Sequence, residues 1–232
     1  MNNGNNKDYV SIVYDLERKP KTKYPKQLVE YLINRFDLQK NLKLVEIGCG
    51  RGDFLTEFQN AGLKCMGIDR EISSVKLNPH LKVYKCDISC EKLPFDDNSM
   101  DVVYNKSVLE HLYDPSNLMN ETIRILKPGG KLIVLTPDWH TQWKNFFEDF
   151  THSRPYDMMS LHDLLKVYGF NNLVVEKFYQ LPIVWKYPLV KLISKILRIV
   201  TGVYAGRWLT NRTGIKFFRW STELMILGYG QK

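Results

Sequence analysis

The 232-residue sequence predicts an α/β fold with a mostly parallel sheet and helices on both faces. Short apolar runs, typical of strands buried on both faces, alternate with segments of helical periodicity. A glycine-rich turn joins the first of these runs to a helix. Hydrophobic and charged fractions of 44% and 25% are those of a globular protein. The length suffices for one sizeable core, so we treat residues 1–232 as a single domain.

The glycine turn follows the first apolar run, Leu44–Ile47, with Gly48, Gly50 and Gly52 at alternating positions. Its G-x-G-x-G spacing differs from the G-x-G-x-x-G dinucleotide fingerprint and from a P-loop. Glycines allow backbone angles that are forbidden to other residues, and they let a ligand approach the backbone closely. The next helix, which Asp53 is expected to cap, would present its N–H groups to that ligand.

Three acidic residues stand at the ends of predicted strands. Glu46 ends the first strand, where it would repel a phosphate but suits a ligand with an amino group or hydroxyls. Asp69 follows a predicted strand at Lys64–Ile68, and Asp87 follows another at Lys82–Lys85. Ligands of open parallel sheets bind at this edge, and Asp69 has the spacing of a ribose-binding carboxylate. The alternative is that the acids are ordinary helix caps and the turn is purely structural.

These stretches together resemble the class I S-adenosylmethionine-dependent methyltransferases. The resemblance covers Leu42–Trp139 closely and extends more loosely to about Phe178. It implies an enzyme that uses S-adenosyl-L-methionine, on a Rossmann-like sheet of seven strands with the last one antiparallel. The motifs that carry it are Glu46–Gly52, Gly67–Arg70, Lys85–Ile88, Leu93–Asn105 with Val108–Leu112, and Leu126–Val134.

The resemblance also implies which residues hold the cofactor. Asp69 would bind its ribose, while Asp87 and Ile88 would lie near its adenine. The segment with Asn105 and His111 would lie against the methionine part of the cofactor. For His111 two roles are open: packing or hydrogen bonding, and catalysis. The implied cofactor residues are Glu46, Gly48, Cys49, Gly50, Gly52, Asp69, Arg70, Asp87, Ile88, Asn105 and His111.

An aromatic segment after the predicted fifth strand is expected to overhang the site. Its part Asp149–Tyr156 resembles a segment of methyltransferases from bacterial cell-surface glycan clusters. His152 is the candidate general base, because histidine titrates near neutrality and can take a hydroxyl proton. The alternative is a structural histidine that bonds the loop backbone. Arg154 would hold an acidic or phosphorylated substrate, or pair with Asp149. The candidate substrate-binding residues are Trp139, His140, Arg154 and Tyr156.

The remaining elements complete the predicted domain. A helix is expected at Tyr24–Phe36, and residues 1–7 are expected to be disordered. Tyr9 and Tyr14 would fold over the cofactor or pack on the domain surface. The predicted segments are 1–40 as N-terminal extension and helix, 41–180 as cofactor-binding core, 181–220 as a basic helical insert between strands six and seven, and 221–232 as the last strand.

The net charge of +8 comes from the C-terminal part of the chain. Between residue 181 and the end there are nine basic residues, and the only acid is Glu223. The rest of the chain holds 24 basic and 24 acidic residues, so the excess of charge is local. The basic residues of this part are Lys186, Lys191, Lys195, Arg198, Arg207, Arg212, Lys216, Arg219 and Lys232.

Within the insert, Pro188–Val200 is predicted to be an amphipathic helix that ends near Gly202. A basic amphipathic helix with aromatic neighbours is typical of a membrane interface. The alternatives are a helix packed on the domain with a solvated basic face, and a site for RNA. The apolar face comprises Leu189, Leu192, Ile193, Ile196 and Val200, and the basic face Lys191, Lys195 and Arg198.

The sequence therefore predicts O-methylation of a sugar in a cell-surface glycan or lipid-linked glycan precursor. No Asn/Asp-Pro-Pro-Tyr motif follows the predicted fourth strand. Its absence argues against methylation of the exocyclic amines of nucleic-acid bases. The alternatives are a methyltransferase of a soluble metabolite or RNA, and a non-catalytic protein that binds the cofactor or a partner.

We expect a cytoplasmic protein, peripheral on the inner face of an anionic membrane through residues 186–220. The N-terminal residues lack the apolar run of a signal peptide, and no stretch reaches the ~20 apolar residues of a membrane span. Nucleic acid is the less favoured partner, and no metal ion is expected. Four cysteines without paired C-x-x-C spacing are expected to be thiols in a reducing compartment: Cys49, Cys65, Cys86 and Cys90.

Overall fold

The computed structural model describes residues 20–71, 73 and 79–232, and Tyr9, Tyr14 and the segment 1–7 lie outside these residues. The strands are β1 (Lys43–Ile47), β2 (Lys64–Asp69), β3 (Val83–Lys85), β4 (Met100–Lys106), β5 (Leu126–Pro137), β6 (Asn171–Phe178) and β7 (Met225–Gln231). The helices are α2 (Tyr24–Phe36), α3 (Asp53–Asn60), α5 (Ser116–Ile125), α6 (Trp139–Gln142), α7 (Met158–Val167), α8 (Pro182–Lys186), α9 (Pro188–Thr213) and α10 (Lys216–Thr222). Two 3-10 turns are η1 (Leu109–His111) and η2 (Phe146–Glu148).

The seven strands form one sheet with the order β3-β2-β1-β4-β5-β7-β6. β1 pairs in parallel with β2 and β4, and β2 pairs in parallel with β3. β6 and β7, the last two strands of the chain, pair antiparallel. The predicted α/β class, with a mostly parallel Rossmann-like sheet of seven strands, is confirmed.

The chain forms two compact units. The first contains residues up to Asn105 together with Ser116–Lys131, and the second contains Lys106–Pro115 with Leu132–Lys232. The glycine turn, Asp69 at the end of β2 and Asp87 after β3 belong to the first unit. The aromatic segment and the basic insert belong to the second.

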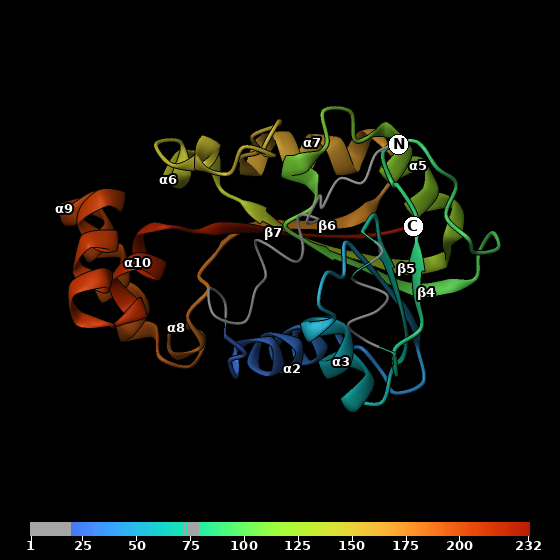
Figure 1. Cartoon of the computed structure of the whole chain (residues 1–232), viewed down its shortest axis with the longest axis horizontal. Coiled ribbons are helices and arrows are strands. Elements are labelled where there is room, and N and C mark those ends of the chain that lie inside the picture. The colour runs from blue at the N-terminus through green and yellow to red at the C-terminus, as the bar shows by residue number, and fades with distance from the viewer. Residues whose placement is uncertain (1–19, 72, 74–78) are drawn as a thin grey trace, which may run out of the picture. The chain divides into compact units, whose positions relative to one another are not determined.

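In the first unit, α2 and α3 lie side by side (Figure 1). The ring of Tyr24 meets the ring of Phe54 edge-on, with 6.3 Å between the centroids. Leu28 and Leu32, one turn apart on α2, are fully buried. The predicted helix at Tyr24–Phe36 is therefore confirmed, and its apolar stripe faces the core as the spacing requires.

Two boundaries in the first unit differ from the prediction. Asp53 does not cap α3, because the cap is Gly52 with φ of 71°, and Asp53 instead pairs with Arg51 at 2.6 Å. The fifth strand, which the sequence predicts at Lys131–Thr136, begins earlier, at Leu126 directly after α5. The last carbonyl groups of α5, on Arg124 and Ile125, accept hydrogen bonds from backbone N–H groups of the loop before β4, which ends the helix there.

In the second unit, the helical insert between β6 and β7 is present as α8, α9 and α10. Gly202, with φ of 65° and ψ of −179°, breaks α9 at the predicted position. After this break the chain is helical again, and this second half of α9 packs on α10 (Figure 1). The close approach is made at Gly206, which is buried.

Glu223, the only acid between residue 181 and the end of the chain, is buried directly after the insert. Glu223 is 1% exposed, and its carboxylate binds both Arg207 and Arg219, the latter at 3.0 Å. Arg207 also pairs with Glu148 of η2. Two of the insert's cations therefore stabilise the fold and are not available to an external partner.

We predict that Gly206→Ala destabilises the insert. A Cβ at this position would lie 2.6 Å from Thr222 Oγ1 and 2.9 Å from the carbonyl oxygen of Phe218, so the two helices would have to separate. The expected loss is about 1–3 kcal/mol in the free energy of unfolding, measured by thermal or urea melting. Leu192→Ala, on an exposed part of α9, is the control and should change stability by less than about 0.5 kcal/mol.

Candidate functional site

The glycine turn after β1 has the conformation that its sequence predicts. Gly48, Gly50 and Gly52 all have positive φ, at 72°, 49° and 71°. A Cβ built on Gly50 would meet nothing within 4 Å, so the space beside this residue is open. The N–H groups of Gly48 and Cys49 both donate to the carbonyl oxygen of Ile68, which fixes the turn against the end of β2. The turn is thus rigid on one side and open on the other.

Asp69 ties β2 to this turn. One carboxylate oxygen accepts the N–H of Gly50 at 2.7 Å, and the other accepts the N–H of Glu71 at 2.9 Å. The residue is 8% exposed. Each carboxylate oxygen can accept a further hydrogen bond, so Asp69 can hold a ligand hydroxyl while it orders the turn.

The next strand end presents Asp87 and Ile88, both half-buried. The hydroxyl and N–H of Ser89 donate to Asp87, and these hydrogen bonds lower the pKa of its carboxyl. The side-chain amide of Asn117 donates to the carbonyl oxygens of Ile88 and Glu91, which holds this turn in place. The sequence analysis did not identify Asn117, because its role depends on packing between distant segments.

Three further predicted cofactor residues of the first unit differ in burial. Glu46 and Asn105, at the ends of β1 and β4, are each 2% exposed, whereas the side chain of Arg70 is exposed beside Glu71. Within the described residues, Asn105 Oδ1 accepts no hydrogen bond.

Burial, with the nearby Glu46 as a smaller cause, raises the pKa of the Cys65 thiol to about 12. All four cysteines are free thiols, as predicted.

The second unit contains a polar cluster around Glu110, which lies on η1 directly after β4 in the chain. Its side chain is completely buried, and this burial raises the pKa of its carboxyl to about 7. Oε2 accepts the hydroxyl of Thr136 at 2.9 Å, whereas Oε1 has no hydrogen-bond partner within the described residues. Its backbone carbonyl accepts the N–H groups of Ser153 and Arg154. These contacts hold the loop that carries His152 against η1.

His111 and His152 lie beside this carboxylate, with 4.8 Å between their ring centroids. Nδ1 of His152 lies 2.7 Å from the carbonyl oxygen of Phe146, which can only accept a hydrogen bond, so Nδ1 carries the proton. Nδ1 of His111 lies 2.8 Å from Thr151 Oγ1, and that hydroxyl donates its proton to Asp149. The hydrogen-bond network therefore assigns the lone pair of both rings to Nε2.

His152 bonds the loop backbone through Nδ1, as the alternative of a structural histidine predicted. Its Nε2 keeps a lone pair, so the role of a general base stays open to it. His111 makes a hydrogen bond to Thr151, in line with the hydrogen-bonding role that was one of its predicted alternatives. Both residues of the alternative pair, Arg154 and Asp149, contact other groups in the structure. Asp149 accepts from Thr151, and Arg154 donates to the carbonyl oxygen of Tyr113 at 3.2 Å.

The predicted substrate-binding residues lie in two environments. His140 and Arg154 are exposed, and the guanidinium of Arg154 lies over the ring of Tyr156 at 5.9 Å. Tyr156 is 3% exposed, and burial raises the pKa of its hydroxyl to about 12. Trp139 is half-buried, and its ring meets Phe146 edge-on. The backbone N–H of Trp139 donates to Tyr156, which joins the two predicted residues.

Asp138 is a polar residue of this region that the sequence analysis missed. It directly follows β5, is fully buried, and lies 3.4 Å from Nζ of Lys177. The signal that selected Asp69 and Asp87, an acid just past a strand, also applies to Asp138.

Residues 17–175 match the model of a protein family described as a methyltransferase domain, and this match spans more than half of the chain. The chain belongs to the methyltransferase domain family. The predicted resemblance to S-adenosylmethionine-dependent methyltransferases is confirmed, and with it the prediction of an enzyme domain that uses this cofactor.

Several known methyltransferases are similar to this chain. A sterol 4-C-methyltransferase of Caenorhabditis elegans is 30% identical over 152 residues, which cover 59% of this chain and 45% of the relative. Phosphoethanolamine N-methyltransferase 3 of Arabidopsis thaliana is 30% identical over 161 residues, which cover 62% and 32%. This methyltransferase domain thus spans less than half the length of these two curated relatives.

A solved structure with the same fold is a SAM-dependent methyltransferase from Archaeoglobus fulgidus. It aligns with a TM-score of 0.66 at 21% identity, over 97% of this chain and all of that one. At this identity the likeness concerns the fold, which it shares along nearly the whole chain.

We predict that Asp69→Ala lowers the affinity of this methyltransferase domain for S-adenosylmethionine by about 10–100-fold, since a charge-assisted hydrogen bond and the order of the glycine turn are lost together. Equilibrium dialysis with labelled cofactor measures this change. Asp101→Asn is the control, because Asp101 lies at the amino end of β4 and pairs with Lys127. Equal affinities of the two variants would contradict the assignment of Asp69.

Proposed function

We propose that this methyltransferase domain methylates a hydroxyl of a sugar in a cell-surface glycan or lipid-linked glycan precursor, at a membrane surface. The observation that carries the proposal is an apolar face of α9 that the described part of the chain leaves uncovered. The histidines beside Glu110 support a hydroxyl as the acceptor.

The first unit has features that fit S-adenosylmethionine. The open space at Gly50 accepts a ligand against the backbone, and Asp69 lies where it can bind two ribose hydroxyls. Asn105 Oδ1 offers a buried acceptor to an amino group, and Glu46 adds a negative charge. We propose that these residues, with Asp87 and Ile88 at the adenine, hold the cofactor. When bound, it supplies a methyl group that its sulfonium has already activated.

Residues of this chain then have two tasks in an O-methyl transfer. They orient the acceptor oxygen, which is the larger contribution when the methyl group is activated. They also receive the proton that the hydroxyl loses as its oxygen gains the methyl group. His152 is the proposed acceptor of this proton, because its Nε2 carries a lone pair while Nδ1 is held by Phe146. Arg154 is exposed beside it and suits an acidic or phosphorylated acceptor.

The uncovered face of α9 supports a lipid-anchored acceptor. Six apolar side chains at helical spacing are 53–76% exposed: Leu189, Leu192, Ile193, Ile196, Ile199 and Val200. The predicted alternative, in which the apolar face packs on the domain, is not what the structure has. Ser194 is instead the fully buried residue of this half of α9, and Val190 packs on the small core of Tyr179 and Leu181.

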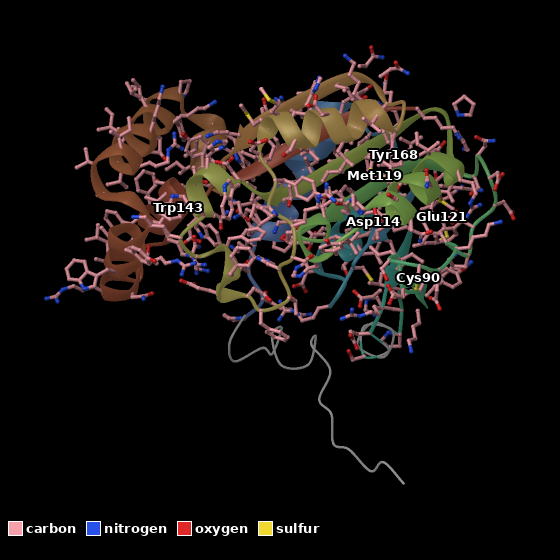
Figure 2. All side chains as sticks on the ribbon, turned by 90° about the horizontal axis from the view of Figure 1, so that it is seen from above. Cys90, Asp114, Met119, Glu121, Trp143 and Tyr168 are labelled. Carbon is pink, nitrogen blue, oxygen red and sulfur yellow. The ribbon has the colours of Figure 1, made fainter. Side chains whose placement is uncertain are left out.

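Charged and aromatic side chains also occur on α9 and in contact with it. Lys191 and Lys195 are exposed, and neither forms an ion pair within the residues described. Arg212 lies over the exposed ring of Trp208, and Lys144 lies over the rings of Trp143 and Tyr204. Figure 2 shows Trp143 beside the helices of the insert. None of the helices in the described ranges has the length and apolar character to cross a bilayer. This combination suits a helix that lies in the interface of an anionic membrane.

We predict that Ile196→Glu with Ile199→Glu lowers binding to vesicles that contain anionic lipid by more than about 10-fold, because each buried isoleucine contributes about 1.5–3 kcal/mol. Vesicle sedimentation measures the bound fraction, and high salt should reduce the binding of the unchanged protein. Val167→Glu is the control, since Val167 is equally apolar and 79% exposed but lies on α7. If the unchanged protein failed to sediment with these vesicles, the membrane proposal would be lost.

We predict that His152→Ala lowers turnover about 100-fold at unchanged cofactor affinity, because general-base catalysis contributes about that much. The assay follows labelled methyl groups from S-adenosylmethionine into fractionated cell envelope, with His162→Ala on α7 as the control. Label in the lipid-extractable glycan fraction supports the proposal. Label only in added phosphoethanolamine, the substrate named for one relative, would replace it with N-methylation of a soluble acceptor.

A further inference from the structure

We propose that Glu110, His111 and His152 bind a divalent transition-metal ion at a site with open coordination positions. All three residues belong to the second unit. One carboxylate oxygen and one nitrogen of each ring lie within 4.8 Å of one another. The residues come from η1 and from the loop after η2, which are separated in sequence but joined by backbone hydrogen bonds to Glu110.

The ligand types favour a transition metal. Two imidazoles with one carboxylate form a facial set that suits Mn²⁺, Fe²⁺, Co²⁺ or Zn²⁺ and leaves positions for other ligands. Metal–ligand bonds of about 2.0–2.2 Å place neighbouring ligand atoms about 3–4 Å apart, so the observed spread closes with shifts of about half an ångström per side chain. An Mg²⁺ site would instead use oxygen ligands throughout.

The hydrogen bonds behind the two rings are those of metal-binding histidines. Such histidines usually donate their second N–H to a carbonyl or a carboxylate, which fixes the ring and its tautomer. Here Nδ1 of His152 donates to the carbonyl oxygen of Phe146. Nδ1 of His111 donates to Thr151, which in turn donates to Asp149 at 2.6 Å. Both networks direct the lone pair to Nε2, the atom that would bind the metal.

The carboxylate provides a second and independent indication. Glu110 is fully buried, and its Oε1 has no hydrogen-bond partner within the described residues. A buried acceptor is costly unless a donor or a cation satisfies it. Thr136 holds only the other oxygen, at 2.9 Å. A metal ion between this oxygen and the two rings would satisfy Oε1 and neutralise the buried charge.

An ion at this place would also change how the acceptor is activated, and this step rests on the proposed function. The hydroxyl oxygen of a sugar would occupy an open position, and the metal would lower the pKa of that hydroxyl. The proton would then leave to water as the oxygen gains the methyl group. His152 would serve as a ligand in place of a proton acceptor.

The direct test is metal binding by the full chain in the absence of any acceptor. Protein stripped with EDTA is titrated with Mn²⁺, followed by the electron paramagnetic resonance signal of the free ion, and with Co²⁺, followed by visible absorption. We expect saturation at about one ion per chain, and a rise in the melting temperature with Mn²⁺. His111→Ala and His152→Ala should each lower the affinity at least about 10-fold.

Matched variants separate the site from general effects on folding. His140→Ala and His162→Ala remove histidines outside the cluster and should bind as the unchanged protein does. Thr151→Val keeps all three ligands but removes the hydroxyl behind His111, and it should weaken metal binding by about 10-fold.

The absence of saturable metal binding, or equal binding by His152→Ala and the unchanged protein, would overturn the site. Methyl transfer that resists EDTA but is lost in His152→Ala would overturn the metal's role and leave the proposed function intact. Metal binding without methylation of any glycan fraction would support the site and count against the proposed function.

Discussion

The hydrogen bond from the N–H of Gly50 to the carboxylate of Asp69 is the contact on which the first unit depends. It joins the turn after β1 to the end of β2 at 2.7 Å, and the other oxygen of the same carboxylate orders the backbone at Glu71. The turn reaches this carboxylate only because Gly48 and Gly50 have positive φ. One acid thus shapes the turn and keeps oxygens that can accept a ligand hydroxyl, so the fold and the proposed cofactor site are encoded in the same few residues.

Glu110 has a structural role in the second unit like that of Asp69 in the first, because it joins separate segments of the chain. Its backbone carbonyl holds the loop of His152, its side chain holds Thr136, and its remaining oxygen is buried without a hydrogen-bond partner among the described residues. Ordinary protein interiors do not retain such a group without a reason. The buried carboxylate and the two histidines are therefore the place in this unit where we propose chemistry on an acceptor.

Much of the fold follows from local patterns. Apolar runs predicted the strands, and the spacing of Leu28 and Leu32 predicted α2 to its exact limits. The glycines predicted the open turn, since glycine adopts its positive φ angles without the steric cost that a Cβ brings. The cap of α3 was missed because a glycine in the left-handed region has no side chain to signal it. The start of β5 depends on hydrogen bonds from the loop before β4, which no local pattern reveals.

Candidate site residues could be selected from the sequence where the residue type and its position indicate a single role. Asp69 and Asp87 were selected by their position after predicted strands and His152 by its chemistry, and their roles in the site stay predictions. The cluster with Glu110 and His111 was not found, because it needs residues about forty positions apart to meet. Periodicity also showed that α9 has an apolar face, but only the structure shows that Leu192 and Ile196 are exposed.

The central claim is that the glycine turn beside Asp69 binds S-adenosylmethionine. Its most direct test is a ¹H–¹⁵N spectrum of the labelled protein while S-adenosylhomocysteine is added. The account predicts saturable shifts of the amide signals of Gly48 and Gly50. If the compound left these two signals unchanged at saturating concentration, the account would be contradicted.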